Sequence, residues 1–338
     1  MIPFQYSRAN DVADAVRMIA ADPSAKFIAG GTNLVDLMKE DVERPSRLID
    51  ISRLPLKTVE ATADGGLRIG ALVPNSDLAY HPLIEQRYPL VASAILAGAS
   101  AQLRNMASTG GNLLQRTRCA YFYDTVTPCN KREPGSGCSA IGGLNRIHAI
   151  LGASESCIAT HPSDMCVALA ALDAKVRVTG PAGERVLAFN DFHRLPGTTP
   201  QIDTNLQPNE IVIAVELPAL GFASNYSYLK IRDRLSYAFA LVSIAAALEL
   251  EGGTIKQARL ALGGVAHKPW RSTEAEAALR GQRADADSFA RAAELLLRDA
   301  KGYEHNEFKI ELARRGIIRT LTQAAQATPQ SQSDKKIR

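Results

Sequence analysis

Four of the five cysteines in this 338-residue chain lie between positions 119 and 157, where their spacing could hold a metal group. They are Cys119, Cys129, Cys138 and Cys157, separated by nine, eight and eighteen residues. Structural zinc sites usually hold their cysteines in close pairs, about two to four residues apart, and this segment has no such pair. Four thiolates also complete the ligands of a [4Fe–4S] cluster. The spacing therefore favours an iron–sulfur cluster, with zinc as the alternative.

The segment around these cysteines, residues 113–157, shows no regular periodicity. It contains four basic residues whose charge would offset that of a cluster: Arg116, Arg118, Lys131 and Arg132. Structureless loops of this length are uncommon inside compact domains unless they are functional. We therefore expect a functional insertion at this point of the chain.

The fifth cysteine, Cys166, lies in an apolar segment that predicts a helix over residues 165–172. A buried free thiol is the expectation for such a position. An odd cysteine count suits a disulfide scaffold poorly, although disulfides stay open if the protein is exported. His161 precedes a proline at the predicted helix start and is expected to cap or pack, and not to bind a metal.

Two glycine-containing segments, residues 29–33 and 108–112, could bring the backbone close to a phosphate. Glycine permits that approach, and amide N–H groups at a following helix start can bind an anion. Each segment alone could equally be a tight turn without a ligand. Two such segments in one chain could bind one diphosphate from both sides. The spacing is not G-x-G-x-x-G, so a Rossmann dinucleotide site is not supported.

Composition limits the classes of function. The chain has 39 basic and 35 acidic residues, a net charge of +4 that is too mild and too evenly spread to predict a nucleic-acid partner. No run of about 18 apolar residues occurs, so no membrane insertion is expected. The first residues lack a basic stretch followed by an apolar one, so we expect no signal peptide of the chain's own.

The pattern along the chain predicts three parts that each combine strands and helices. Residues 1–55 alternate strand and helix, with a glycine turn after the second strand. Residues 56–220 begin with a predicted hairpin and carry the cysteine-rich insertion at about 113–158. Residues 221–325 are expected to form three strands followed by helices. The tail, residues 326–338, is rich in Gln, Ser and Lys and is expected to be disordered.

Four short sequence motifs occur along the chain in this order: K-F-I-A-G-G-T-N-L at 26–34, L-R-N-M-A-S-T-G-G-N at 103–112, S-D at 163–164 and A-L-G-G-V at 261–265. Together they resemble the FAD-binding subunit of molybdenum hydroxylases, the family of xanthine dehydrogenase and aldehyde oxidase. The resemblance covers nearly the whole chain. It is strongest to the medium subunit of bacterial periplasmic aldehyde oxidoreductases, which carry FAD and an extra [4Fe–4S] cluster, as 4-hydroxybenzoyl-CoA reductase does. Most of the family lacks the four-cysteine insertion.

The resemblance implies the three-part α+β FAD-binding fold of this family, which is not a Rossmann fold. It implies FAD and a [4Fe–4S] cluster as cofactors, with the four clustered cysteines as metal ligands. Both glycine segments would contact the FAD pyrophosphate, with an acidic contact at Asp164, an apolar one at Val212 and a lysine near the flavin at Lys230. The implied cofactor-binding residues are Lys26, Phe27, Ile28, Ala29, Gly30, Gly31, Thr32, Asn33, Leu34, Ser108, Thr109, Gly110, Gly111, Asn112, Asp164, Val212 and Lys230.

The resemblance also implies a function, namely an electron-transfer subunit of a molybdenum-containing aldehyde oxidoreductase. In the family, a large molybdenum-cofactor subunit oxidises the substrate. Electrons then pass through the [2Fe–2S] centres of a small subunit to FAD and on to an external acceptor. We expect no catalytic acid or base in this chain, because the flavin carries the redox chemistry. A periplasmic location, by export with a signal-bearing partner, is expected; otherwise the location is cytoplasmic.

Two other functions stay open. A self-contained flavoprotein oxidoreductase would bind its own substrate in the third part and would turn over as an isolated chain. A zinc-stabilised scaffold subunit would use the glycine segments only as turns, and it would purify without colour.

Overall fold

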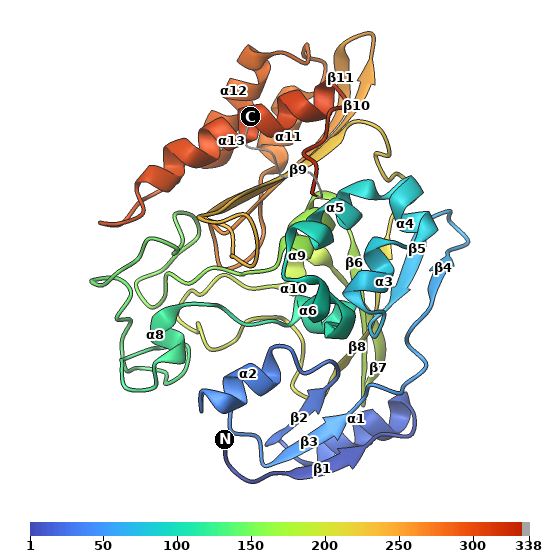
Figure 1. Cartoon of the computed structure of the whole chain (residues 1–338), viewed down its shortest axis with the longest axis vertical. Helices are drawn as coiled ribbons and strands as arrows, with labels where there is room; N and C mark the ends of the chain where they lie inside the picture. Colours follow the sequence, from blue (N-terminus) through green and yellow to red (C-terminus); the bar gives the residue numbers. More distant parts are fainter. Residues whose placement is uncertain (333–338) are drawn as a thin grey trace.

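Three β-sheets follow one another along the chain in the computed structural model, which describes residues 1–332 (Figure 1). The first sheet is parallel, in the order β1-β3-β2, and consists of β1 (Gln5–Arg8), β2 (Ala25–Ile28) and β3 (Arg47–Asp50). Two helices connect these strands, α1 (Val12–Ala21) and α2 (Leu34–Lys39). Helix α1 begins where the sequence predicts because the carboxylate of Asp11 accepts the amide of Asp14 at 2.7 Å.

The second sheet is antiparallel and has five strands in the order β4-β5-β8-β6-β7. Its strands are β4 (Val59–Ala61), β5 (Leu67–Gly70), β6 (Lys175–Gly180), β7 (Gly183–Ala188) and β8 (Ile211–Leu217). The helices of this part are α3 (Asn75–Ala79), α4 (Pro82–Arg87), α5 (Pro89–Ala97), α6 (Ala101–Met106), α7 (Thr109–Leu113), α9 (Asp164–Ala171) and α10 (Phe189–Phe192). Of these seven, α9 matches the helix predicted over residues 165–172, whereas α3, α4, α6, α7 and α10 have only four to six residues, too few to show a helical period.

The third sheet has the order β12-β11-β10-β9 and lies between two layers of helices. Its strands are β9 (Tyr226–Ile231), β10 (Val242–Glu251), β11 (Thr254–Gly263) and β12 (Trp270–Arg271), and its own helices are α11 (Thr273–Leu279), α12 (Ala286–Leu297) and α13 (Phe308–Ala325). Alternate residues of β10 face opposite layers: Ala245 and Ala247 pack in the core with α5 and α9, whereas Ile244 and Leu248 pack in the core with α11–α13. Burial on both faces explains why this strand is apolar from Ile244 to Leu248.

Separate parallel and antiparallel sheets with their own helices confirm the predicted α+β class and exclude a Rossmann fold for the described residues. Between α7 and α9 the only helix is α8 (Ala120–Tyr123), so the predicted insertion is indeed largely irregular (green loops, Figure 1). It has a small core of its own, in which Phe122 is fully buried beside Leu37 of α2. The insertion therefore packs against the first part of the chain.

The first residues after α13 lie against β9. The amide of Gln330 donates to Ser227 Oγ at 3.1 Å, and Gln332 Nε2 donates to the carbonyl of Tyr228 at 2.9 Å. The start of the predicted disordered tail is thus hydrogen-bonded to the third sheet, and its last six residues, 333–338, lie outside the described residues. Among residues 1–332, none of the helices combines the length and the apolar character needed to cross a bilayer.

A buried ion pair joins the second part of the chain to the third. Asp164, at the start of α9, accepts from Lys230 Nζ of β9 at 2.7 Å and from Tyr228 Oη at 2.7 Å. The side chains of Lys230 and Asp164 are only 3% and 8% exposed. Removing one member of such a pair leaves the other charge buried and uncompensated.

We predict that Asp164→Asn lowers the free energy of unfolding by about 3–5 kcal/mol, because the ammonium of Lys230 then stays buried without its counter-ion. Asp233→Asn is the matched control: Asp233 pairs with Arg146 at 2.8 Å, but both side chains are more than half exposed. It should cost at most about 1 kcal/mol. Urea denaturation of the two variants measures both effects, and equal losses would contradict the role of the buried pair.

Candidate cofactor site

A cavity of about 390 Å³ is lined by the first and second parts of the chain. Its walls come from β2 and the turn into α2, from the start of α7, and from residues 204–212, which lead into β8. Ligand sites of small molecules and cofactors usually fall in the range of about 300–1,000 Å³. The cavity is therefore large enough to hold a substantial part of a cofactor.

The structure brings most of the predicted cofactor-binding residues together in this cavity. Those that line it are Lys26, Phe27, Ile28, Ala29, Gly30, Gly31, Thr32, Asn33, Leu34, Ser108, Gly110, Gly111 and Val212. Four others do not line it: Thr109, Asn112, Asp164 and Lys230. Asn112 lies next to it, with its amide group 2.9 Å from Asn75 Oδ1. Asp164 and Lys230 instead form the buried ion pair between α9 and β9.

The turn between β2 and α2 has unused hydrogen-bond donors. A Cβ on Gly30 would lie 1.7 Å from the backbone oxygen of Met106, so only glycine fits there, and Gly31 adopts a left-handed φ of +72°. Within residues 1–332, the amides of Gly30, Gly31 and Thr32 have no hydrogen-bond acceptor. The buried Nδ2 of Asn33 also lacks a partner in that range. Such donors beside a cavity match the needs of a phosphate.

The second glycine segment differs from the expectation. Residues 108–112 are not an open loop but the N-cap and first residues of α7, because Ser108 Oγ accepts the amide of Gly111 at 3.2 Å. The amide of Gly110 donates to the carbonyl of Ala71 at 2.7 Å. Both glycine amides are therefore already bound within the chain, so this segment shapes the cavity without offering them to a ligand.

Charged side chains connect the cavity wall to the cysteine insertion. Arg116, on the wall, lies 2.6 Å from Glu43 and 2.8 Å from Asp203. Burial opposes the charge of Arg116, but the two carboxylates outweigh it and raise the pKa of the guanidinium. Burial also opposes the charge of Asp203, whose pKa is nevertheless held well below its usual range by Lys131 and Arg116. Lys131 belongs to the insertion, so Asp203 ties that insertion to the cavity.

The four cysteines of the insertion line one small cavity of about 10 Å³. Cys129 and Cys138 face each other in an isolated antiparallel bridge, and none of the four is in a disulfide. No three of their sulfurs lie within 4.8 Å of one another. A single zinc ion with Zn–S bonds of about 2.3 Å would hold its sulfurs closer, roughly 3.8 Å apart. The sulfurs are therefore spread more widely than a single zinc ion would hold them.

Hydrogen-bonding groups lie beside two of these sulfurs. His148 Nε2 is 3.1 Å from Cys119 Sγ, and the amide of Ala159 donates to Cys157 Sγ at 3.4 Å. Burial raises the pKa of Cys119 to about 12 and that of Cys157 to about 11, so without a metal both are protonated thiols near neutral pH. Hydrogen bonds to ligating sulfurs are among the factors that set the potential of an iron–sulfur cluster.

Sequence reasoning misses part of the cavity wall. The lining also includes residues that are not among the predicted cofactor residues: Glu43, Arg116, Thr204, Leu206, Gln207, Pro208 and Glu210. Glu43 and Glu210 come from loops far apart in the sequence, and no local pattern marks them. Arg116 is visible in the sequence only as a positive charge near the cysteines.

Two sequence families match this chain. The FAD binding domain in molybdopterin dehydrogenase matches residues 2–220, and the CO dehydrogenase flavoprotein C-terminal domain matches residues 226–324. The aldehyde oxidoreductase FAD-binding subunit PaoB of Escherichia coli (strain K12) is 52% identical over 326 residues, which cover 96% of this chain and 99% of that protein.

Solved structures share the fold. Carbon monoxide dehydrogenase from Hydrogenophaga pseudoflava, in a form that lacks the Mo-pyranopterin moiety of the molybdenum cofactor, aligns with a TM-score of 0.76 and 26% identity over 97% of this chain and 99% of that chain. Quinoline 2-oxidoreductase from Pseudomonas putida 86 aligns with a TM-score of 0.74 and 25% identity over 97% and 98% of the two chains. With the family matches, the chain therefore belongs to the FAD-binding subunits of the molybdopterin dehydrogenases, which are oxidoreductase components.

Proposed function

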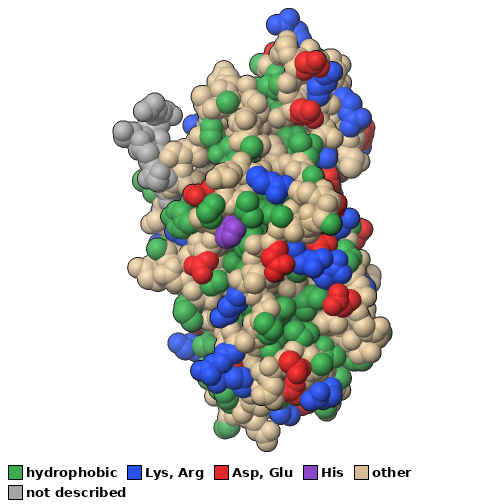
Figure 2. Space-filling view, turned by 90° about the vertical axis from the view of Figure 1, so that its right-hand side faces the viewer, with side chains coloured by type: hydrophobic (Ala, Val, Ile, Leu, Met, Phe, Trp, Pro, Cys, Tyr) green, Lys and Arg blue, Asp and Glu red, His purple; other side chains and the backbone are tan. Residues whose placement is uncertain are grey.

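We propose that this chain is the FAD-binding electron-transfer subunit of a molybdenum-containing aldehyde oxidoreductase. The observation that carries the proposal is the 52% identity, over almost the full length of both chains, to the Escherichia coli aldehyde oxidoreductase subunit. On the face shown in Figure 2, Lys and Arg side chains are interspersed with Asp and Glu. Such a mixed surface does not form the field of one sign that nucleic-acid binding favours.

FAD suits the larger cavity on three observations. The turn at residues 29–33 has unused amide donors, Asn33 has a buried Nδ2 without a partner, and Gly111 leaves room where a side chain would intrude. These residues would hold the pyrophosphate, and Val212 would give an apolar contact. When bound, FAD supplies the capacity to take up electrons and pass them on. Asp164 and Lys230 stay proposed FAD contacts on the resemblance alone.

We predict that Gly111→Val loses most of its FAD while the fold survives. Gly111 is exposed at the cavity, and a Cβ there would meet only the hydroxyl of Ser108 at 2.9 Å, so the added bulk is directed at the ligand space and not into the core. Flavin extracted per chain measures the effect. Gly142→Val is the matched control, because Gly142 is exposed, has no neighbour within 4 Å of its Cβ position and lies outside the cavity. Full FAD occupancy in Gly111→Val would contradict the assignment of this cavity as the FAD site.

We also propose that Cys119, Cys129, Cys138 and Cys157 bind a [4Fe–4S] cluster. In support, the four line one cavity, their sulfurs are spread more widely than one zinc ion requires, and hydrogen-bonding groups lie beside two of them. A cubane cluster places each cysteine on a different iron, which spaces the sulfurs apart. The fully buried ring of Phe122 would shield this site from water.

We predict about four irons per chain in protein prepared without oxygen, following four-cysteine ligation. Cys129→Ser should lose most of that iron. Cys166→Ser should keep it, because Cys166 lies in α9 and does not line the four-cysteine cavity. Loss of the cluster should also loosen FAD, although less than Gly111→Val does, since Arg116 and Asp203 connect the two sites. Measuring the iron content of the two cysteine variants tests this ligand set. Loss of iron in Cys166→Ser but not in Cys129→Ser would show that the ligand set is wrong.

The partners proposed for this chain are a large molybdenum-cofactor subunit, a small [2Fe–2S] subunit and an external electron acceptor. Electrons would reach this chain from the [2Fe–2S] centres of the small subunit. Outside the four-cysteine cavity the chain has one further cysteine, which is too few for a second iron–sulfur site of four thiolates. A periplasmic location, through export together with a signal-bearing partner, is part of the same proposal.

We predict that the chain purified from its native host comes with those two subunits and that the isolated chain does not oxidise aldehydes. Ultraviolet–visible spectra and an aldehyde-oxidation assay on both preparations test this. Flavin bands with a broad brown absorbance support the proposal. Turnover by the isolated chain would favour a self-contained flavoenzyme, and a colourless chain would favour a zinc-stabilised scaffold.

A further inference from the structure

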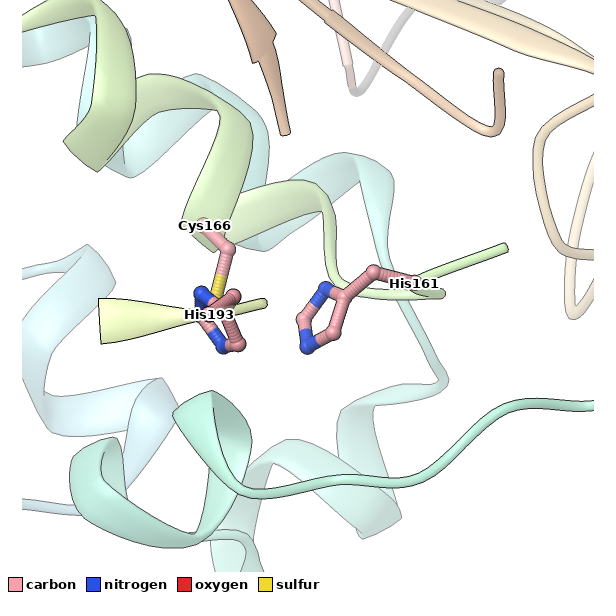
Figure 3. A group of neighbouring side chains, drawn as sticks. All are labelled: His161, Cys166 and His193. Carbon is pink, nitrogen blue, oxygen red and sulfur yellow. The ribbon is translucent and has the colours of Figure 1, made fainter. Parts of the chain in front are cut away.

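Three side chains outside both candidate sites gather at the start of α9: His161, Cys166 and His193 (Figure 3). One ring nitrogen of each histidine and the thiol sulfur lie within 4.8 Å of one another. In Figure 3 the Cys166 side chain points from the first turn of α9 toward the His193 ring, and the His161 ring stands beside them. The three come from separate segments, because His161 precedes α9 and His193 follows α10.

Two ring nitrogens of this group are buried without a hydrogen-bond partner among the described residues, Nε2 of His161 and Nδ1 of His193. His193 is 3% exposed and Cys166 is fully buried. A buried polar atom that makes no hydrogen bond costs free energy, so such atoms are rare in folded proteins. Two of them facing one thiol point to a ligand that the chain itself does not supply.

The remaining hydrogen bonds prepare the imidazoles for a metal. His193 Nε2 lies 2.8 Å from the carbonyl oxygen of Leu113, so Nε2 carries the proton and Nδ1 keeps its lone pair. Metal-bound histidines are usually held in this way, with the second N–H donated to a carbonyl or carboxylate. Nδ1 of His161 accepts the amide of Ser163 at 3.4 Å. Binding through Nε2 of His161 moves its proton to Nδ1 and gives up only that long contact.

We propose that His161, Cys166 and His193 bind one Zn²⁺ ion, a site separate from the FAD and iron–sulfur sites and independent of the proposed function. One thiolate and two imidazoles form a ligand set that suits zinc, and three protein ligands leave a fourth position for water. On binding, the S–H bond of Cys166 breaks, a Zn–S bond forms and the proton leaves to solvent.

The ion would fasten the segment before α9 to the segment after α10. It would also support α7, since His193 is hydrogen-bonded to Leu113, the last residue of that helix. A ligand that binds only the folded chain raises its stability by mass action. The structure thus assigns this zinc a stabilising role beside the cofactor cavity.

The test measures zinc, copper and iron per chain in the intact complex, together with zinc K-edge X-ray absorption. We expect about one zinc per chain, with one sulfur and two imidazole nitrogens as protein ligands. The zinc content per chain of Cys166→Ser and of His193→Gln should each fall tenfold or more. Both variants should unfold at a lower temperature, and both should keep their iron. Cys129→Ser should keep the zinc. His305→Gln is the matched histidine control, because His305 is exposed and outside the group; it should keep both metals.

The zinc K-edge spectrum of the unmodified complex identifies the zinc ligands even if a variant fails to fold. The amount of flavin per chain shows whether each variant has folded. A zinc shell of four sulfurs would place the ion in the cysteine insertion and would overturn the proposal. So would copper in place of zinc, zinc that persists in both Cys166→Ser and His193→Gln, or an unmodified complex without zinc after growth with added zinc.

Discussion

The partly buried carboxylate of Asp203 is the contact on which the relation between the two candidate sites depends. It accepts from Arg116 on the cavity wall and from Lys131 in the cysteine insertion, and His267 Nε2 lies 3.8 Å away. The side chain of Lys131 is only 1% exposed, and its other acceptor is the carbonyl of Pro200 at 2.7 Å. A buried ammonium needs its counter-ion. Asp203 therefore fixes where the insertion sits, and with it the cysteines on either side of Lys131.

The same network explains how an irregular insertion can be ordered beside a cofactor cavity. Only two residues separate Arg116 from Cys119, so the chain passes directly from the cavity wall to the first thiol. The backbone amide of Arg116 also donates to Asn33 Oδ1 at 3.0 Å, and this bond reaches the turn between β2 and α2. Because Arg116 contacts the turn, the wall and Asp203, a change at either site displaces groups that belong to the other. This is the physical reason to expect FAD and cluster occupancy to be coupled.

The sequence predicts the secondary structure well wherever a periodic apolar pattern or a helix-capping residue determines it. Strands and helices alternate in the first part, and helices follow the strands of the third part, as expected, because Asp11 caps α1 and the apolar run of β10 is buried on both faces. The short helices α3, α4 and α6 escape prediction because five or six residues cannot show a helical period. The pairing of Asp164 with Lys230, 66 residues away, and the meeting of His161 with His193 arise only from tertiary packing, which a local pattern does not encode.

The two glycine segments show how one motif can take on two roles. In the turn at residues 29–33 glycine is required by the backbone of Met106, and the amides stay free; in α7 the amides are already bound to Ser108 and Ala71. A diphosphate in this cavity would therefore gain backbone hydrogen bonds from the first turn but not from the amides of Gly110 and Gly111. Gly111 matters for the space it leaves and Asn33 for the donor it offers. The two segments differ because the hydroxyl of Ser108 caps a helix at the second one and so binds the amide of Gly111.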